Sequence, residues 1–338
     1  MSALDGAAYS PKEFQLAFVA ESTIGTANVS SMQLVNIDSI EMPNFNLTQV
    51  LDPRSGSSGR VFDVDDAHID EKGVAKEITF SGVFDAAVAP FLVQNCIGLV
   101  ESSDVVTIPA TYTPPELETG DNSSVTIADT ITIAVIAPAT SGGNRSIIFP
   151  GCTITNLTIS GDMANESGRL KFSATAKTGY ISSFTQAAPS SPSAYGTSFY
   201  SLATLAGTAQ KTIAGAEHCV IQSFSLNLEN PSEYIGQNDA NGNPEAIVRA
   251  VPELSATLDA TVKYDNQTAE LPTTMKAGTT VVSNLANHAT IGSATSFGFI
   301  GSYGKITSVA YNEANAMMYD VSVKFGASGA NAMLAIRT

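Results

Sequence analysis

The chain has 338 residues, a length that suggests about two domains of ordinary size. Apolar residues make up 43% of it and charged residues only 14%, whereas the usual charged fraction is about 25%. The formal net charge is −16, so the chain is not expected to bind nucleic acid by neutralising phosphates or to dock on an anionic membrane. A surface poor in lysine and glutamate is typical of surfaces that neighbouring subunits cover.

The three cysteines, Cys96, Cys152 and Cys219, form no CxxC pair and are odd in number. They are therefore predicted to be buried free thiols. The first residues lack the basic and apolar segments of a secretory signal, and no apolar run approaches ~20 residues. From these features we expect the chain to fold in a cytoplasm without a membrane anchor.

Alternating apolar and polar residues, rich in β-branched and aromatic side chains, predict half-buried strands. In chain order these strands are 39–47, 77–84, 129–136, 153–160, 169–176, 222–229, 253–264, 306–311 and 319–325. One helix is predicted over 85–98, where Val88, Leu92 and Cys96 recur every four residues. Pro90 falls in its first turns, where proline is tolerated. The chain is expected to be mainly β.

Three blocks of the sequence recur in the same order. The segment ITNLTISGDMANESGRLKFSATA (154–176) resembles ITSVAYNEANAMMYDVSVKFGA (306–327), and 37–47 resembles 221–231 at an offset of 184 positions. A third block matches at an offset of 180 positions, pairing Phe84 with Tyr264, Asp85 with Asp265 and Gly98 with Gly278. Any two alternating strands joined by a polar turn look alike, but the shared order favours a tandem duplication.

The duplication divides the chain into a first domain, 1–190, with an N-terminal arm at 1–32, and a second domain, 191–338. A stretch rich in Pro, Ser and Ala at 185–198 marks the boundary. Each unit contains a strand, a long polar excursion, a returning strand, a short helix or turn, and a closing hairpin. The N-terminal arm at 1–32 and the excursions at 48–76 and 230–252 are expected to be loose in the free subunit and to become ordered when subunits stack.

No catalytic, metal or cofactor site emerges from the sequence, so the chain is not expected to be an enzyme. His68, His218 and His288 each stand alone, without the spacing of metal ligands. The acidic run DVDDAHIDE (63–71) offers carboxylates for a divalent cation, but it is more simply a solvated loop. The segment NDANGNPE (238–245) lacks the glycine and closing glutamate of a calcium loop and is interpreted as a turn.

The pattern of strands resembles that of the tail tube proteins, or major tail proteins, of long-tailed bacteriophages. The resemblance is carried by the long hairpin at 223–265, the helix or turn that follows it, and the closing hairpin at 154–180 that recurs at 306–327. The acidic, Trp-free composition is similar too. The resemblance implies two tandem β-sandwich tube-type domains. Each would have a short flanking helix and a long hairpin that joins a ring-shaped inner β-barrel.

The resemblance also implies a structural virion protein that assembles into stacked rings, through which DNA passes without specific binding. Ordinary tube rings contain six copies of one such domain, so a duplicated chain is expected to form a trimeric, pseudo-sixfold ring. The implied partners are other copies of the chain and the tail tip, terminator and tape-measure proteins. The implied location is the virion tail, after assembly in the host cytoplasm. If the duplication were absent, a hexamer would be expected.

Acidic side chains facing the channel would repel DNA phosphates and prevent trapping. The candidates lie in the two long excursions: Asp63, Asp65, Asp66, Glu233, Asp239 and Glu245. Solubility of the free subunit would explain the same charge equally well.

Three other functions stay open at this stage. A bacterial surface-layer or adhesin protein shares the acidic, Ser/Thr-rich β composition. A capsid decoration or other virion protein would form separate spikes. A β-sandwich hydrolase would need convergent acids that the sequence does not show.

Overall fold

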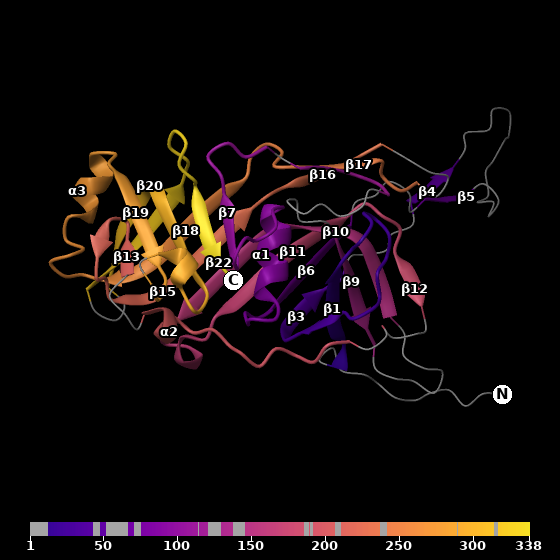
Figure 1. Cartoon of the computed structure of the whole chain (residues 1–338), viewed down its shortest axis with the longest axis horizontal. Coiled ribbons are helices and arrows are strands. Elements are labelled where there is room, and N and C mark those ends of the chain that lie inside the picture. Colours follow the sequence, from indigo (N-terminus) through magenta and orange to yellow (C-terminus); the bar gives the residue numbers. More distant parts are fainter. Residues whose placement is uncertain are drawn as a thin grey trace.

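We analysed a computed structural model of the chain. The structure describes residues 13–42, 48–51, 67–70, 76–113, 115–120, 130–137, 146–185, 189, 192–206, 211–236, 242–288, 290–313 and 317–338. The protein is mainly β, with 54% strand and 10% helix, and its strands form a large antiparallel sheet. Figure 1 shows an elongated molecule with α3 (Leu271–Lys276) at one end and the hairpin β4 (Thr48–Leu51) and β5 (Ala67–Asp70) at the other.

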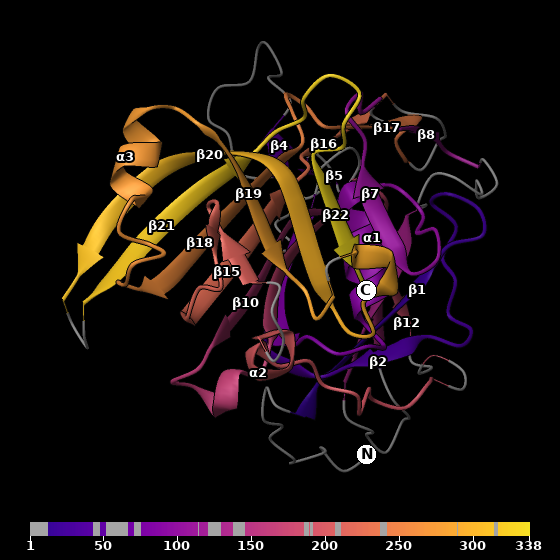
Figure 2. The ribbon, with the colours of Figure 1, turned by 60° about the vertical axis from the view of Figure 1, so that its left-hand side comes forward.

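The main sheet contains eight antiparallel strands in the order β3-β6-β11-β10-β15-β18-β21-β20. Their bounds are β3 (Ile37–Glu41), β6 (Lys76–Val83), β11 (Lys171–Thr178), β10 (Ser146–Asp162), β15 (Ile221–Glu229), β18 (Ser255–Lys263), β21 (Met318–Phe325) and β20 (Gly298–Asn312). Figure 2 shows β15, β18, β21 and β20 side by side. The first four strands come from the first half of the chain and the last four from the second half.

Both long strands, β10 and β20, leave the main sheet and continue into a second group of strands. The N-terminal part of β10 belongs to a group of strands in the order β2-β1-β9-β10-β12. The N-terminal part of β20 belongs to a group in the order β14-β13-β19-β20-β22. The first group comprises β1 (Gln15–Ala20), β2 (Gln33–Val35), β9 (Ile131–Ile136) and β12 (Ser183–Thr185). The second comprises β13 (Lys211–Ile213), β14 (Ala216–Glu217), β19 (Thr280–Leu285) and β22 (Leu334–Arg337). The two halves therefore share one plan.

The register of the strand pairs repeats as well. The β10–β11 ladder shifts between Ile154 and Asn156, and the β20–β21 ladder shifts between Ile306 and Ser308. The β3–β6 ladder shifts after Ile37, and the β15–β18 ladder shifts after Ile221. Bulges locally bend a strand and are specific features of a fold. The β3–β6 bulge, at Ile37 opposite Gly82, recurs at Ile221 opposite Val262, which gives offsets of 184 and 180 positions, as in the sequence. The bulge in β10 recurs in β20 at an offset of 152 positions. The boundary at residue 190 stays a prediction.

The turn that leads into the helix after the second strand is held in the same way in both halves. The Asp85 carboxylate accepts hydrogen bonds from the Ala87 and Val88 amides at 2.9 and 3.2 Å before α1 (Ala89–Ile97). Asp265 accepts bonds from the Gln267 and Thr268 amides at 3.0 and 3.3 Å before α3. Such bonds satisfy amides that have no partner within a helix. Gly98 and Gly278, both with positive φ, follow the two helices. The predicted helix is confirmed, although it begins at Ala89 because Asp85 first forms a turn.

The nine predicted strands occur, with shifted ends. The segment 39–47 is β3, which begins at Ile37 and ends at Glu41, and residues 43–47 lie outside the described part of the chain. Segments 153–160 and 306–311 are only the C-terminal parts of the long strands β10 and β20. One apolar cluster, which contains residues of both halves, fills the interior on one side of the main sheet.

Two connections cross from one half to the other. The segment between α1 and β9 supplies β7 (Val105–Ile108), which pairs with β22, and β8 (Glu116–Glu118). The excursion after β15 supplies β16 (Ser232–Ile235) and β17 (Ala246–Arg249), which form a three-stranded sheet with β8. The expectation that 230–252 is loose is wrong for its described residues, because Ile247 and Arg249 are fully buried. The same expectation for the N-terminal arm is wrong for its described residues 13–32, because Leu16, Ala17 and Phe18 of β1 are fully buried. Short helices α2 (Leu202–Ala206), η3 (Glu166–Gly168) and η4 (Ile291–Ser293) complete the fold.

A buried carboxylate holds three separate segments of the first half together. Glu21 is 2% exposed and accepts hydrogen bonds from the Gly25 and Gly151 amides at 2.8 Å each. The Thr130 and Thr132 hydroxyls also donate to it. Both glycines have positive φ, and a side chain on either would collide with the Tyr180 ring. Burial raises the pKa of Glu21, and the four hydrogen bonds oppose that rise.

We predict that Asp85→Ala lowers the free energy of unfolding by about 1–3 kcal/mol, because the substitution leaves buried donors without an acceptor. Asp85 is fully buried and also accepts a hydrogen bond from the side-chain amide of Asn36 at 3.0 Å. The matched variant Asp265→Ala, at a half-buried position, should cost about 0.5–1 kcal/mol. Urea unfolding measures both, and equal losses would contradict the prediction.

We also predict a pH dependence of stability from Glu21. Its raised pKa means that the native chain retains this proton at a pH where the unfolded chain has lost it. The free energy of unfolding should therefore fall as pH rises from about 4.3, the ordinary glutamate pKa, to the raised native value. Glu21→Gln should flatten the profile over this interval in urea titrations, and an unchanged profile would contradict the prediction.

Candidate functional site

The main sheet has one apolar face and one polar face. Strand alternation places the apolar side chains of the eight strands in the core and sends their neighbours to the opposite side. One row across that side consists of Ser39, Ser81, Ser173, Thr158, Asn227, Thr257 and Lys324. The adjacent row, two residues further along each strand, consists of Glu41, Thr79, Thr175, Asn156, Glu229 and Ser255. We call this surface the polar face.

Side-chain hydrogen bonds run between neighbouring strands on the polar face. The Ser39 and Ser81 hydroxyls lie 2.8 Å apart, and the Thr158 hydroxyl donates to the Asn227 side-chain oxygen at 3.0 Å. The Thr261 hydroxyl donates to Asp320 at 2.7 Å. Cross-strand pairs of this kind stabilise a sheet whose surface has no apolar cover. The polar face is thus a continuous hydroxyl and amide surface that needs no partner to bury it.

Charged groups on the polar face are sparse and partly paired. The Lys171 ammonium lies 2.9 Å from the Glu166 carboxylate and 3.2 Å from that of Asp38. Hydrogen bonding to these two carboxylates raises the pKa of Lys171. The remaining carboxylates on this side include Glu77, Asp162, Asp259 and Asp320, and the other lysines are Lys177, Lys263, Lys305 and Lys324. A surface with mixed, mostly uncharged groups offers little attraction to a polyanion.

The two ends of the main sheet are open. Within the described residues, β3 has a strand partner only on its β6 side. Residues 306–312 of β20 have one only on their β21 side. The main sheet of a single chain is therefore not a closed barrel. Open edges expose backbone donors and acceptors that can pair with another strand.

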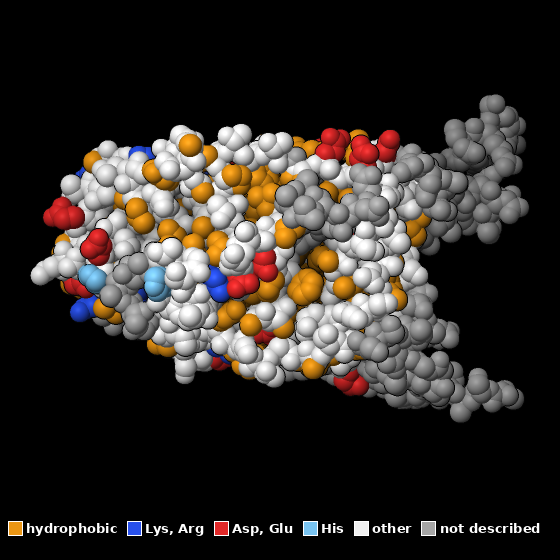
Figure 3. All heavy atoms as spheres, viewed as in Figure 1, with side chains coloured by type: hydrophobic (Ala, Val, Ile, Leu, Met, Phe, Trp, Pro, Cys, Tyr) orange, Lys and Arg blue, Asp and Glu red, His pale blue; other side chains and the backbone are white. Residues whose placement is uncertain are grey.

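The predicted lumen residues lie away from the polar face where they can be placed. Asp63, Asp65, Asp66 and Asp239 lie outside the described residues, as do most of the acidic run 63–71 and part of the turn 238–245. Glu233 lies on β16 and Glu245 just before β17, both exposed on the three-stranded sheet. Figure 3 shows acidic side chains gathered along the upper edge, where β16 and β17 run in Figure 1. Their role in lining a channel stays a prediction.

The three-stranded sheet is fixed to the body by buried polar groups. Arg249 donates from Nη2 to the Cys96 and Ile154 carbonyls at 2.9 Å each. The Asn230 amide donates to the Cys96 and Ile97 carbonyls at 2.7 and 3.1 Å, so the C-terminal end of α1 is satisfied. Burial lowers the pKa of Arg249 and raises that of the nearby Tyr234. These contacts explain why the second excursion is ordered in a single chain.

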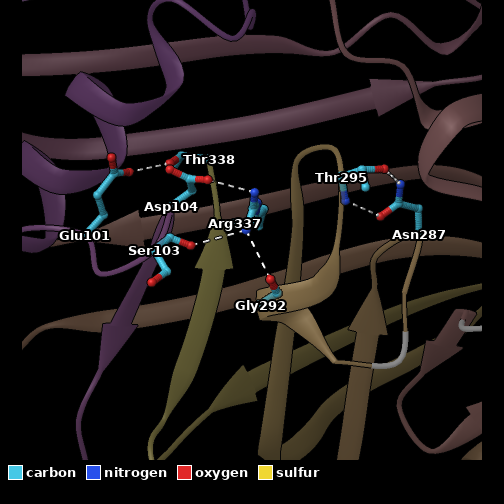
Figure 4. A network of polar contacts seen from close by, with 8 residues as sticks. All are labelled: Glu101, Ser103, Asp104, Asn287, Gly292, Thr295, Arg337 and Thr338. Atoms are coloured by element: carbon cyan, nitrogen blue, oxygen red, sulfur yellow. Dashed lines mark hydrogen bonds and ion pairs between the residues drawn. The ribbon is translucent and has the colours of Figure 1, made fainter.

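A second polar network joins the last strand to the first half, as Figure 4 shows. Arg337 of β22 pairs with the Asp104 carboxylate at 2.8 Å and donates to the Ser103 and Gly292 carbonyls at 3.2 and 3.3 Å. The Thr338 hydroxyl donates to Glu101 at 2.8 Å. The network reinforces the β7–β22 pairing at the junction of the two halves.

The cysteine prediction is confirmed, because Cys96, Cys152 and Cys219 are free and buried. Burial raises the pKa of the Cys96 thiol to about 12 and that of Cys219 to about 11. Such thiols are poor nucleophiles at neutral pH. Among the described residues, no three His, Cys, Asp or Glu side chains gather in a way that would hold a metal ion. No helix within them is long and apolar enough to cross a membrane.

Neither the family models nor the curated proteins supply a relative of this chain. No model of a protein family matches the chain. No curated protein matches its sequence significantly. The functional argument therefore depends on the repeated sheet, its polar face and its two open edges.

Proposed function

We propose that this chain is a structural subunit of the tail tube of a long-tailed bacteriophage. Three copies would close into a pseudo-sixfold ring, and rings would stack around a channel for DNA. In this assembly each half acts as one tube-type β-sandwich domain. Its partners would be other copies of the chain and the tail tip, terminator and tape-measure proteins. Another virion structural protein or a bacterial surface-layer protein is the alternative.

One observation carries the proposal. The four-strand order β3-β6-β11-β10 recurs as β15-β18-β21-β20, and the chain joins the two sets edge to edge through β10 and β15. The junction already present within one chain has the form that a ring needs between chains. Repeating it from β20 of one copy to β3 of the next closes the sheet and removes both open edges.

The polar face supports the same function. Closing a ring of such sheets puts one face toward the axis and the other toward the outer strands. The apolar face of the main sheet is covered by the core, so the polar face is the one that would line a channel. Its serine, threonine and asparagine side chains would bind water along the channel wall, and its carboxylates would repel phosphates. This assignment offers a second set of channel residues beside the six acidic residues of the excursions.

The test of assembly is negative-stain microscopy of the purified chain across concentration, with light-scattering mass on the soluble fraction. We expect rings of three chains or tubes of uniform width with a central channel. Added tail tip proteins serve as initiators where the chain alone stays monomeric. Separate spikes, or monomers at every concentration with initiators present, would contradict the proposal.

We further predict that the polar face is shielded in the assembled tube. Thr257→Cys on this face should react with a bulky maleimide in the free subunit and become protected after assembly. Thr279→Cys, at an exposed position after α3, should react in both states. The natural thiols are buried and give little background. Equal reactivity of Thr257→Cys before and after assembly would place the polar face on the outside. Glu233→Cys, measured in parallel, tests the first set of channel residues.

A further inference from the structure

Apolar side chains are exposed at the open β20 end of the main sheet. Tyr264, Tyr311 and Met317 are 37%, 63% and 60% exposed, and we call them the tyrosine patch. The Tyr264 and Tyr311 rings lie 6.5 Å apart between centroids, and both contact the buried Tyr319 ring, at 5.3 and 4.9 Å. Exposed aromatic groups that are clustered in this way are typical of surfaces that bind another protein.

The tyrosine patch has counterparts in the first half that are completely buried. The strand registers match Tyr264 with Phe84, Tyr311 with Ile159, and Met317 with Leu170. One backbone bond confirms the match: the Phe84 amide donates to the Leu170 carbonyl at 3.0 Å, and the Tyr264 amide donates to the Met317 carbonyl at 2.9 Å. Phe84, Ile159 and Leu170 are each 0% exposed. The same three positions are therefore buried in one half and open in the other.

Residues of the second half cover the buried counterparts. Ile159 lies opposite Leu226 in the β10–β15 ladder, and the Phe84 ring contacts the Phe297 ring with centroids 4.9 Å apart. Among the described residues no strand pairs with the outer side of β20 at 306–312, so the corresponding surface around Tyr311 stays open. The exposure of the tyrosine patch thus marks the place of a missing neighbour.

We propose that the missing neighbour is the β3 edge of a second copy, paired antiparallel with β20 in the register of the β10–β15 junction. Transfer of that register places Tyr311 opposite Met42, Asn312 opposite Glu41 and Glu313 opposite Ile40 of the next copy. These pairs correspond to Ile159 with Leu226, Ser160 with Ser225 and Gly161 with Phe224 within the chain. The inference rests on the proposed ring and specifies its contact.

The β3 edge suits this role. Its outer side has no strand partner among the described residues, and Ile40 and Met42 are only partly buried against the core. A hollow of about 650 Å³ lies beside its start, with Phe14, Val35 and Ile37 among its lining residues. Because β20 and β3 are different surfaces, the contact is heterologous and can close a ring. Pairing of β20 with a second β20 would give only a dimer.

Fluorescence tests whether Tyr311 becomes buried. The chain contains no tryptophan, so Tyr311→Trp introduces a single probe at a position where the free subunit leaves room. We expect its emission to shift to the blue on assembly, whereas Val282→Trp, at a 41% exposed position on β19, should change little. Tyr311→Glu should raise the concentration needed for assembly roughly tenfold or more while leaving the monomer folded. An unshifted Tyr311→Trp probe in assembled rings would overturn the inference.

Cross-linking tests the register. Met42→Cys combined with Tyr311→Cys should form disulfides between chains under mild oxidation, because opposed residues of antiparallel strands lie within disulfide reach. Non-reducing gels should then show dimers and a closed covalent trimer. The control, Met42→Cys with Val309→Cys, lies two residues out of register and should cross-link poorly.

Three other outcomes would count against the inference in different ways. Rings that form without the Met42–Tyr311 cross-link would refute the register and leave the tube function standing. Dimers from Tyr311→Cys alone would show β20–β20 pairing instead. A native chain that never forms rings, even with tail tip proteins, would refute the proposed function, and the inference with it.

Discussion

The antiparallel ladder between β10 and β15 is the contact on which the rest of the structure depends. It runs from Asn156 opposite Glu229 to Asp162 opposite Ser223 and joins the two halves into one sheet. Without it, each half would present a four-stranded sheet with two open edges. With it, one apolar cluster extends under all eight strands. Unpaired edge strands promote aggregation of soluble proteins. Here two of the four edges pair with each other inside the chain, as β10 with β15.

The two halves share a plan but are not equal. Only the first half has a long segment between its helix and the next strand, and that segment provides β7 and β8. β7 extends the second half through β22, and β8 receives the β16–β17 hairpin of the second half. Arg249 and Asn230 then bind the carbonyls at the end of α1. Each half therefore stabilises a part of the other that would otherwise be exposed.

The sequence allowed prediction of the strands in which apolar and polar residue types alternate, and most of these are buried on one face only. It did not reveal the N-terminal parts of β10 and β20. In β10 the residues Phe149 and Cys152 are buried with their neighbours, so alternation is lost, and Pro150 and Gly151 are residues that disfavour a regular strand. β1 was missed for the same reason, since Leu16, Ala17 and Phe18 are all fully buried. Pairing partners such as β7 with β22 are far apart in sequence and leave no local signal.

The candidate surface was only partly predictable. The prediction of channel residues relied on charge. It therefore selected the excursions, where acidic residues are dense, and not the rows of the main sheet, where most side chains are uncharged. The signal for the polar face was nevertheless present in the strands, for example in the alternating Ser223, Ser225 and Asn227. What could not be seen was that eight such strands share one face, because this depends on the order in which the strands pair. The open β20 edge likewise emerged only from comparing burial at corresponding positions.

The β7–β22 pairing also has a mechanical consequence. It strengthens the junction inside one chain, together with the Arg337 network and the covalent linkage. The segment between α3 and β19 spans only residues 277–279, too few to supply a similar strand at the other end. In a ring of this chain, the stronger junctions inside each chain would alternate with weaker junctions between chains. Under tension the ring would open between chains and release whole subunits, so the chain itself, and not the half, would be the unit of breakage and exchange.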